Sequence, residues 1–389
     1  MPEKKKQHYI PKMYMKLFAN DNGAVNIFNI KSEKKIPDVP YADQCYKDYY
    51  YGHDLIWENK LGIMEKEWDN IFLKLSKDNA YSLDSNDISL IRQFALYQRH
   101  RTVGNNEYLK EQLTIFHWEC LRMKLQHDKV KFTDQGLEKF IRAKMEDEKI
   151  PQDTLDIAQS AERNCLINDL SFLLINYKTR TELIISDNPI ILINKFDKHN
   201  VGYISMGLVI LFPITPHKLI VFYDSKMYPK NKMIREVVCA NDGEVKSLNV
   251  LQFINAEKIL IYKDEFTIDQ LVKNSNENIK NRNIVRQQDK VFSLGTSENK
   301  MIGLSSTITM YDFNLSFCSL PKFVKKIPEQ CREAAPRKYD PSWGDKFKMK
   351  EEIFPVLVRD GIYDCELSLN ELKRGLEEMT GFANYYWKL

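Results

Sequence analysis

The fold is decided by the stretch GLVILFPITPHKLIVFY, residues 207–223, in which two apolar runs flank a Thr-Pro-His turn. Short β-branched runs bounded by turn residues predict β-strands. Similar runs lie at 173–178, 182–186, 190–194 and 259–262. They are not interleaved with long helices, and this favours an antiparallel sheet over repeated βαβ units. The sequence therefore predicts an α+β fold.

A helical block precedes the predicted sheet. Apolar residues recur at helical spacing, and Asp84 or Ser85 suits the position before a first helical turn. We expect these helices to pack on a mostly antiparallel sheet. The predicted helices cover residues 54–75, 84–101, 106–126 and 153–168.

The length of 389 residues is enough for two domains, or for one large domain with an appendage. We expect residues 1–265 to form the α+β core, helical over 50–170 and sheet-rich over 171–265. The polar, Asn-rich residues in 266–299 predict a linker or exposed helix. Residues 300–389 are expected to be a C-terminal accessory segment with a helix near Ser368–Met379.

Composition and missing motifs exclude several classes of protein. Fifty-seven Lys+Arg against 54 Asp+Glu give a net charge of +3, so nucleic acid could be bound only through a local basic patch. The seven cysteines form no C-x-x-C pair, which is typical of reduced thiols. The dinucleotide fingerprint, P-loop, nucleophile elbow and H-E-x-x-H motifs are missing. No apolar run approaches the ~20 residues of a spanning helix, so we expect a cytoplasmic protein without a membrane partner.

The first candidate site residue is His8, in Gln7-His8-Tyr9-Ile10-Pro11. Proline makes the preceding backbone stiff and extended, which fixes the position of the imidazole. Imidazole titrates near neutral pH, so His8 could be a general acid or base or a metal ligand. The alternative is a histidine with a satisfied hydrogen bond at the start of the fold.

Two carboxylates, Glu58 and Glu65, lie on or beside the apolar stripe of the predicted 54–75 helix. A carboxylate within an apolar stripe is unfavourable unless it is paired with a cation or bound to a metal. Both residues are therefore candidate metal ligands. The alternative is that they reach solvent from the edge of the stripe.

Gln98 and Arg101 lie three residues apart near the end of the 84–101 helix, on the same side as Phe94. An inward-facing Arg101 could pair with Glu58 and Glu65, or its planar guanidinium could clamp a phosphate or carboxylate. A buried Glu–Arg–Glu network that fixes two helices in register is the alternative.

The segment Ser186-Asp187-Asn188-Pro189 follows one apolar run and precedes the next. Polar side chains at the end of a strand are common in functional sites. Asp187 could bind a cation or orient His8, and the proline fixes the direction of Asn188. An ordinary Asx turn between two strands is the alternative.

Together these motifs resemble the family known as domain of unknown function 4238, over about residues 7–265. The resemblance is carried by His8-Tyr9 with Pro11, by Arg101-Thr102, by Ser186 to Pro189, by Phe212-Pro213 and by Asn249. Val103 follows Arg101-Thr102 where the family would have proline, and the last ~90 residues lie outside the match. The family implies no settled reaction and no substrate, but the resemblance favours His8, Arg101, Asp187 and Asn188 as a site. It also resembles proteins met among mobile elements and anti-phage loci.

The leading functional hypothesis is a metal-dependent phosphodiesterase or nuclease, toxin-like or acting in anti-phage defence. Mg²⁺ or Mn²⁺ would activate water, His8 would act as base or ligand, and Arg101 would stabilise phosphate charge. Lys4–Lys6 and Arg99–Arg101 would supply the basic patch for nucleic acid. The predicted roles are catalytic for His8, Arg101, Asp187 and Asn188, substrate-binding for Gln98, Tyr9 and Asn249, and metal-binding for Glu58, Glu65 and Asp187.

The alternative is a non-catalytic interaction or ligand-sensing protein. The His/Arg/Asp cluster would then be a structural polar network, and residues 300–389 would bind a protein partner or mediate self-association. A sensor that binds a nucleotide or another small anion at Arg101 is a variant of this reading.

Overall fold

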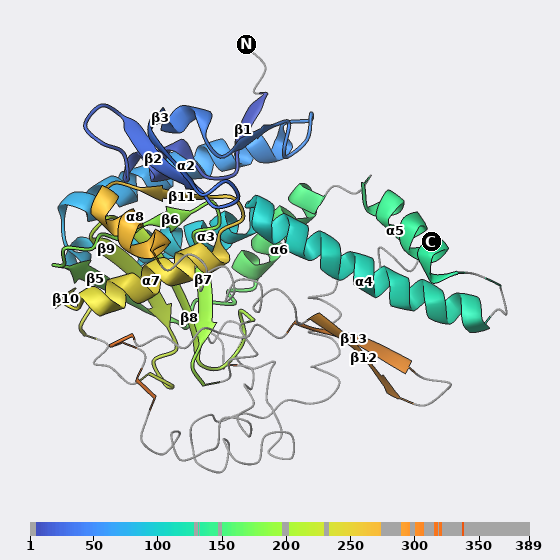
Figure 1. Cartoon of the computed structure of the whole chain (residues 1–389). Coiled ribbons are helices and arrows are strands. Elements are labelled where there is room, and N and C mark those ends of the chain that lie inside the picture. The colour runs from blue at the N-terminus through green and yellow to red at the C-terminus, as the bar shows by residue number, and fades with distance from the viewer. Residues whose placement is uncertain are drawn as a thin grey trace.

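Two β-sheets with covering helices form the body of the protein, which is seen here in a computed structural model (Figure 1). The structure describes residues 5–127, 131, 133–146, 150–196, 202–228, 233–273, 289–295, 300–306, 315–317, 319–320 and 337. The larger sheet has the order β10-β5-β9-β8-β7, and only the β10–β5 pair is parallel. Its strands are β5 (Ser171–Tyr177), β7 (Ile191–Asn194), β8 (Leu208–Thr215), β9 (Lys218–Tyr223) and β10 (Glu236–Cys239).

The second sheet is antiparallel, has the order β3-β2-β11-β6, and joins distant parts of the chain. Its strands are β2 (Ala24–Asn29), β3 (Lys34–Pro40), β6 (Ile185–Ser186) and β11 (Ile259–Tyr262). Two smaller ribbons pair β1 (Lys6–His8) with β4 (Tyr46–Asp48), and β12 (Asp289–Gly295) with β13 (Lys300–Ser306). The N-terminal strand β2 thus pairs with β11, the strand that the sequence predicts at residues 259–262.

Helices account for the rest of the regular structure. The α-helices are α1 (Lys12–Lys16), α2 (Ile56–Lys77), α3 (Ser85–His100), α4 (Val103–His127), α5 (Asp134–Glu146), α6 (Ile150–Arg163), α7 (Asp242–Asn255) and α8 (Glu265–Val272). Short 3-10 turns lie at Tyr41–Asp43 and Ala80–Ser82. Helix α3 begins with a capping box, in which the Asp84 carboxylate accepts from the Asp87 N–H and Asp87 reaches back to the Asp84 N–H.

Both faces of the larger sheet are covered, and this explains why residues 207–212 are continuously apolar. Alternate residues of β8 point to opposite faces. Ile210 and Phe212 pack with side chains of α2, α3 and α6, whereas Val209 and Leu211 pack with Val245 and other residues of α7. A strand buried on both faces has no position for a polar side chain.

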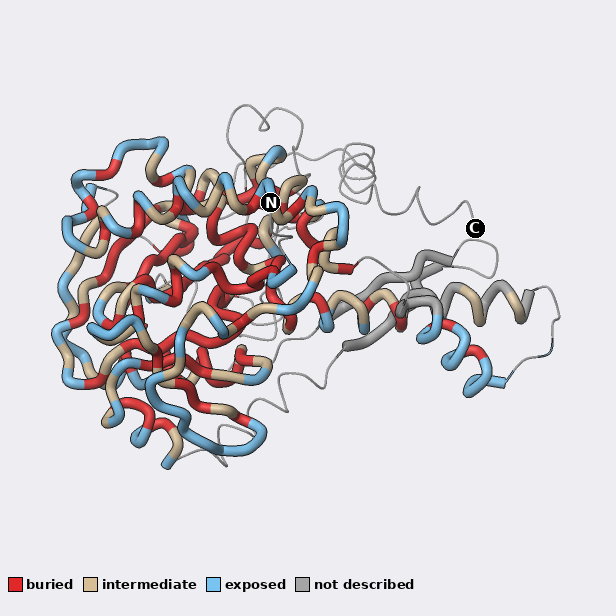
Figure 2. The backbone as a smooth tube through the Cα atoms, turned by 90° about the horizontal axis from the view of Figure 1, so that it is seen from above, coloured by how far each residue is buried: buried red, intermediate tan, exposed pale blue. Residues whose placement is uncertain are grey.

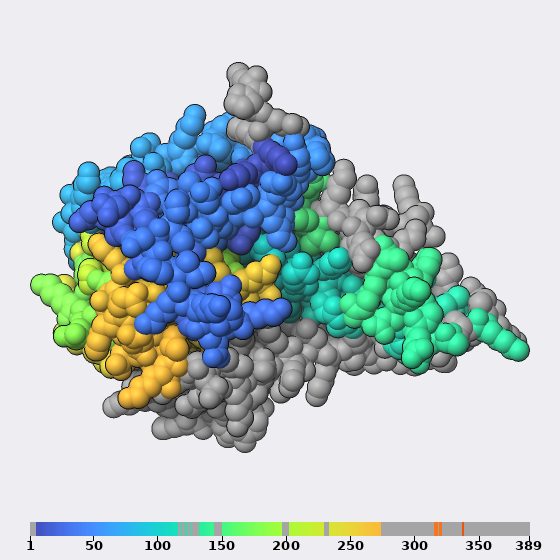
Figure 3. Space-filling model, turned by 45° about the horizontal axis from the view of Figure 1, so that its top comes forward, coloured from blue at the N-terminus to red at the C-terminus, as the bar shows by residue number. Residues whose placement is uncertain are grey.

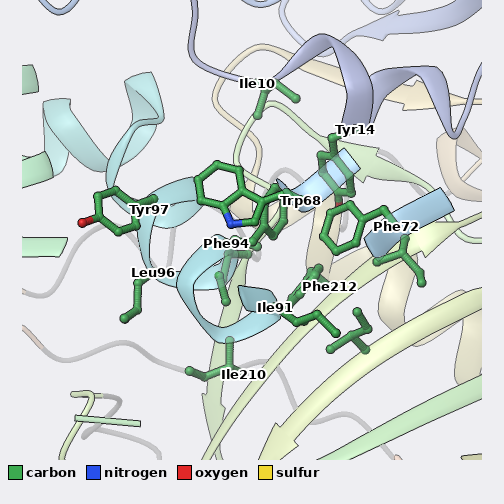
Figure 4. Close-up of a cluster of buried hydrophobic side chains, with 14 of the residues drawn as sticks. Ile10, Tyr14, Trp68, Phe72, Ile91, Phe94, Leu96, Tyr97, Ile210 and Phe212 are labelled. Carbon is green, nitrogen blue, oxygen red and sulfur yellow. The ribbon is translucent and has the colours of Figure 1, made fainter. Parts of the chain in front are cut away.

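Aromatic side chains fill the space between the sheet and the covering helices (Figure 4). Phe94 of α3 meets Phe72 of α2 edge-on, with ring centroids 4.7 Å apart. Trp68 packs edge-on against Phe94 at 5.4 Å and donates its indole N–H to Gln93 Oε1 at 3.1 Å. Tyr14 reaches this cluster from α1, and its hydroxyl donates to the Pro213 carbonyl at 2.5 Å. The N-terminal region is therefore part of the main core.

Helices α4 and α5 project from the compact body as a helical hairpin (Figures 1 and 2). Figure 2 shows that buried residues concentrate in the body, whereas much of α5 is exposed. This helical hairpin has its own small apolar cluster, in which Leu137 and Ile141 of α5 pack with Leu121 and Leu125 of α4.

The predicted α+β class and mostly antiparallel sheet are confirmed. The four predicted helices correspond to α2, α3, α4 and α6, with ends shifted by a few residues. Helices α5 and α7 and strands β3, β4, β10, β12 and β13 were not predicted. Helix α8 lies at the start of the segment expected to be a linker or exposed helix, but its residues Thr267, Ile268 and Leu271 are buried. No helix among the described residues is long and apolar enough to cross a membrane. Most of the predicted linker and the predicted helix near the C-terminus lie outside the described residues.

Candidate functional site

The N-terminal arm, residues 6–11, is buried from Gln7 onward because neighbouring segments pair with it and pack over it. Strand β1 pairs with β4, and the Tyr9 N–H donates to the Cys45 carbonyl at 2.8 Å. Gln7 lies fully inside, where its amide donates to the Gly52 carbonyl at 3.2 Å and accepts from the Tyr51 N–H at 2.5 Å. Pro11 then precedes the first turn of α1, with an extended backbone. The arm presents its backbone carbonyls to α3.

Arg101, the C-cap residue of α3, is the centre of what we call the arm cluster: Gln7, His8, Tyr51, Glu65, Gln98 and Arg101. The Arg101 side chain is 1% exposed. Its Nη2 donates to the His8 carbonyl at 2.5 Å, and its Nε donates to the Tyr51 hydroxyl at 3.1 Å. Its Nη1 lies 2.8 Å from Glu65 Oε1, close enough for an ion pair although not aligned as a hydrogen bond. Arg101 thus fastens the arm to α2 and α3.

The electrostatics of the arm cluster keep Arg101 charged. Burial acts to lower the pKa of the guanidinium, but Tyr51 and Glu65 outweigh it, and the net shift is upward. Burial also raises the pKa of Tyr51 to about 12, against the opposing effect of Arg101. The charge of Glu58, half-buried on α2, also acts on Tyr51. The predicted pairing of Arg101 with the helix-borne carboxylates is found directly for Glu65.

His8 is held by its ring and by its backbone. Its Nε2 lies 2.9 Å from the Ala42 carbonyl, which makes Nε2 the protonated nitrogen of a neutral ring. Burial is the main cause that lowers the pKa of His8, and the charges of Lys12, Glu65 and Arg101 all act on the ring. Beside it, Gln98 donates to the Tyr9 carbonyl at 3.0 Å.

Asp187 follows strand β6 and is 1% exposed. Its carboxylate accepts from the backbone N–H groups of Glu257 at 2.7 Å, Lys258 at 2.8 Å and Ile259 at 3.4 Å. Burial raises the pKa of Asp187 to about 6, although these three donors oppose the shift. Asp187 therefore fixes the turn that leads from α7 into β11, and its oxygens face their own backbone.

Asn188 connects this turn to the arm cluster. Its Oδ1 accepts from the Thr102 hydroxyl at 2.9 Å, and Thr102 is the neighbour of Arg101. Its Nδ2 donates to the Asn255 carbonyl at 3.3 Å, and Asn255 Nδ2 donates back to the Asn188 carbonyl. The structure thus brings the end of α3, the segment after β6 and the end of α7 together.

One face of α7 carries three amides, which we call the α7 ladder: Asn249, Gln252 and Asn255. Asn249 donates to the Glu182 carbonyl at 2.8 Å and accepts from the Ile184 N–H at 3.1 Å. Gln252 donates to the Pro189 carbonyl at 2.9 Å. These amides satisfy the backbone of residues 182–190 much as a neighbouring strand would. The Asn249 side chain is therefore bonded to the backbone of Glu182 and Ile184.

The predicted metal ligands have other partners. Asp187 is bonded to backbone N–H groups and Glu65 to Arg101. Within the described ranges, no group of three or more His, Cys, Asp or Glu side chains is placed to hold a metal ion. Glu58, Glu65 and Asp187 do not form such a group.

Two lysines at the described N-terminus, Lys5 and Lys6, form surface ion pairs. Lys5 lies 3.2 Å from Asp48, and Lys6 lies 3.0 Å from Asp43. Arg101 is buried, and Lys4 lies outside the described residues. Figure 3 shows the blue N-terminal region bordering the yellow and orange surface of α7 and α8.

Sequence reasoning missed several members of this region, namely Tyr51, Thr102, Gln252 and Asn255. Tyr51 is the last of three consecutive tyrosines, and nothing in that run distinguishes it. The three-residue spacing of Asn249, Gln252 and Asn255 is a detectable signal, because such residues share one helix face.

His100 gives a prediction about acid stability. It is 8% exposed, and neither ring nitrogen has a hydrogen-bond partner. Burial, helped by Arg99, lowers its pKa from 6.5 to about 3. A depressed histidine pKa means that stability is fully present above pH 6.5 and is lost as the pH falls toward 3. Between pH 7 and pH 5 we expect His100 to remove about 2 kcal/mol from the free energy of unfolding.

The measurement is urea unfolding of the wild type and of His100→Phe at both pH values. Phenylalanine cannot bind a proton, so the variant should lose about 2 kcal/mol less than the wild type over this interval. An equal loss in the two proteins would show that His100 does not resist protonation in the folded state.

Comparison with known proteins gives one match. The model of a family described as protein of unknown function (DUF4238) matches residues 6–266. This range holds the arm cluster, Asp187, Asn188 and the α7 ladder, and it ends within α8. No curated protein and no solved structure matches the chain.

Proposed function

The chain belongs to the DUF4238 family, and we propose that it is a non-catalytic interaction or ligand-sensing protein whose arm cluster, with Asp187 and Asn188, is a structural polar network. One observation carries the proposal. Arg101 and Asp187, the two charged residues most favoured as catalytic, are each 1% exposed and are directed at the chain's own backbone. Arg101 is held by the His8 carbonyl, the Tyr51 hydroxyl and Glu65, and Asp187 by three backbone N–H groups, so both side chains are engaged in stabilising the fold.

The contacts of the region beyond the family match support an interaction role. Leu315 and Phe317 are buried against the α7 side of the larger sheet. The Ser316 N–H donates to Glu244 Oε2 of α7 at 2.8 Å. The family domain therefore binds a segment of chain on a face that it does not cover by itself. A rigid body that binds segments is a suitable platform for partners.

A second candidate is phosphodiester hydrolysis, the reaction that the sequence predicts, and His8 favours it. The ring is fixed through Nε2, and Glu65 and Lys12 lie near enough for their charges to act on it. A fixed, neutral imidazole can serve as a general base. A toxin-like or anti-phage effector role depends on this second candidate.

One experiment separates the two candidates. The purified full chain is incubated with RNA and with single- and double-stranded DNA, with and without Mg²⁺ or Mn²⁺. The structural proposal predicts either no cleavage or cleavage that His8→Ala retains. Lys16→Ala, which removes an exposed lysine of α1, is the control. Cleavage by the wild type that disappears in His8→Ala, while the variant stays folded, would overturn it in favour of hydrolysis.

A further inference from the structure

Arg337 lies 71 residues beyond the family match, yet its side chain is 1% exposed inside the family domain. Its Nε donates to Asp169 Oδ2 at 2.9 Å, and Nη2 donates to Asp169 Oδ1 at 3.2 Å. This is a bidentate pair, the geometry in which a guanidinium matches a carboxylate. The backbone N–H of Arg337 also donates to the Ile204 carbonyl at 2.7 Å.

Backbone carbonyls complete the site around the guanidinium. Nη2 reaches the carbonyls of Leu166 at 3.0 Å and Tyr203 at 2.7 Å, and Nη1 reaches the carbonyl of Ser205 at 2.7 Å. These acceptors come from two loops, one after α6 and one between β7 and β8. One carboxylate and three carbonyls thus converge on the planar donors of a single guanidinium.

The chemistry of this arrangement selects arginine over lysine. A guanidinium has five N–H donors in a fixed plane, whereas an ammonium is a point charge with three donors that cannot reach acceptors spread around that plane. A buried cation is tolerated only when it is paired and its donors are satisfied. The loops supply what a guanidinium needs, and every one of their acceptors lies within residues 6–266.

We propose that the family domain carries a guanidinium-binding pocket, formed by Asp169 and the carbonyls of Leu166, Tyr203 and Ser205, and that Arg337 fills it in cis. The pocket fastens the C-terminal part of the chain to the domain. Leu315 and Phe317 are a second, apolar attachment on the α7 side. This inference does not depend on whether the arm cluster is catalytic.

The test is chemical rescue of the full-length Arg337→Ala variant. Thermal unfolding is followed with added methylguanidinium or, as the matched cation, methylammonium at the same millimolar concentration. We expect the variant to melt several degrees below the wild type and to recover part of that shift with methylguanidinium only. The wild type, whose pocket is filled, should gain nothing from either cation. Arg142→Ala, which removes an exposed arginine, should likewise gain nothing.

Two further variants keep the test decisive if Arg337→Ala does not fold. Arg337→Lys and Asp169→Asn should both increase the rate at which trypsin removes the chain beyond residue 320, by several-fold over Arg142→Ala. A folded Arg337→Ala that methylguanidinium fails to stabilise would overturn the proposal. An Arg337→Lys variant as stable and as protease-resistant as the wild type would also overturn it.

Discussion

Replacing Arg101 by methionine is expected to lower the free energy of unfolding by about 3 kcal/mol, measured by urea unfolding at pH 7. The substitution keeps most of the apolar stem but removes the guanidinium. The Tyr51 hydroxyl then loses the donor that Arg101 Nε supplies, the His8 carbonyl keeps only the Tyr51 hydroxyl as a donor, and Glu65 loses its ion pair. Each buried group left without a partner costs about 1–3 kcal/mol. Glu65 is partly exposed, so the expected loss lies at the lower end of the range for broken buried pairs.

The matched control for this experiment is Arg142→Met. Arg142 also pairs with carboxylates, Glu111 and Glu138, but on the exposed surface of the α4–α5 hairpin. Exposed ion pairs contribute about 0–1 kcal/mol, so this variant should be close to the wild type. An Arg101→Met protein as stable as the wild type, or more stable, would identify Arg101 as a residue kept for binding or catalysis.

Asp187→Ala should be at least as damaging, with an expected loss of about 2–5 kcal/mol in the free energy of unfolding. Alanine removes the buried carboxylate that accepts from the backbone N–H groups of Glu257 and Lys258 and holds this turn. That turn links α7 to β11, the strand that pairs with β2 and β6. Damage at Asp187 is therefore transmitted to the whole second sheet. The exposed Asp43→Ala, which breaks only a surface pair with Lys6, is the control and should cost less than 1 kcal/mol.

Asp187→Asn adds a test of pH dependence. Because burial raises the pKa of Asp187 from 3.8 to about 6, the folded state favours the protonated carboxyl. Ionisation therefore removes stability as the pH rises from about 4 to about 6, and no more is lost above that. The asparagine variant does not titrate, so its gap to the wild type should narrow over this interval. A gap that widens with pH would show that the three N–H donors outweigh burial.

Much of the fold could be predicted from apolar patterns alone. Residues 207–223 became β8 and β9, because a strand pair buried on both faces leaves an unmistakable apolar signature. Helix α7 was missed for the opposite reason. Its two apolar contacts, toward the larger sheet and toward α8, are interrupted by the α7 ladder, so no single apolar stripe is visible. Polar side chains that replace a neighbouring strand obscure the helical pattern.

The sequence predicts which side chains of the candidate site lie together better than it predicts which groups they bind. His8, Gln98, Arg101 and Glu65 do converge, since helix periodicity and the proline after the arm fix which way they face. Their partners are mostly backbone groups, such as the carbonyls of His8, Tyr9 and Ala42. Backbone groups are the same at every position of a sequence, so nothing in the sequence shows which of them a side chain will reach. A structural network and a catalytic cluster therefore have the same sequence signature here.

Native-state hydrogen exchange at the Tyr9 N–H tests most directly whether Arg101 exists to fasten the N-terminal arm. This amide donates to the Cys45 carbonyl at 2.8 Å. It belongs to the same peptide group as the His8 carbonyl, to which Arg101 donates. In the wild type it should exchange only when the whole domain unfolds. In Arg101→Met it should exchange by local opening of the arm, faster than core amides of β8 in the same sample. If the Tyr9 N–H exchanges as slowly as the β8 amides in both proteins, the N-terminal arm is held without Arg101 and the structural account is contradicted.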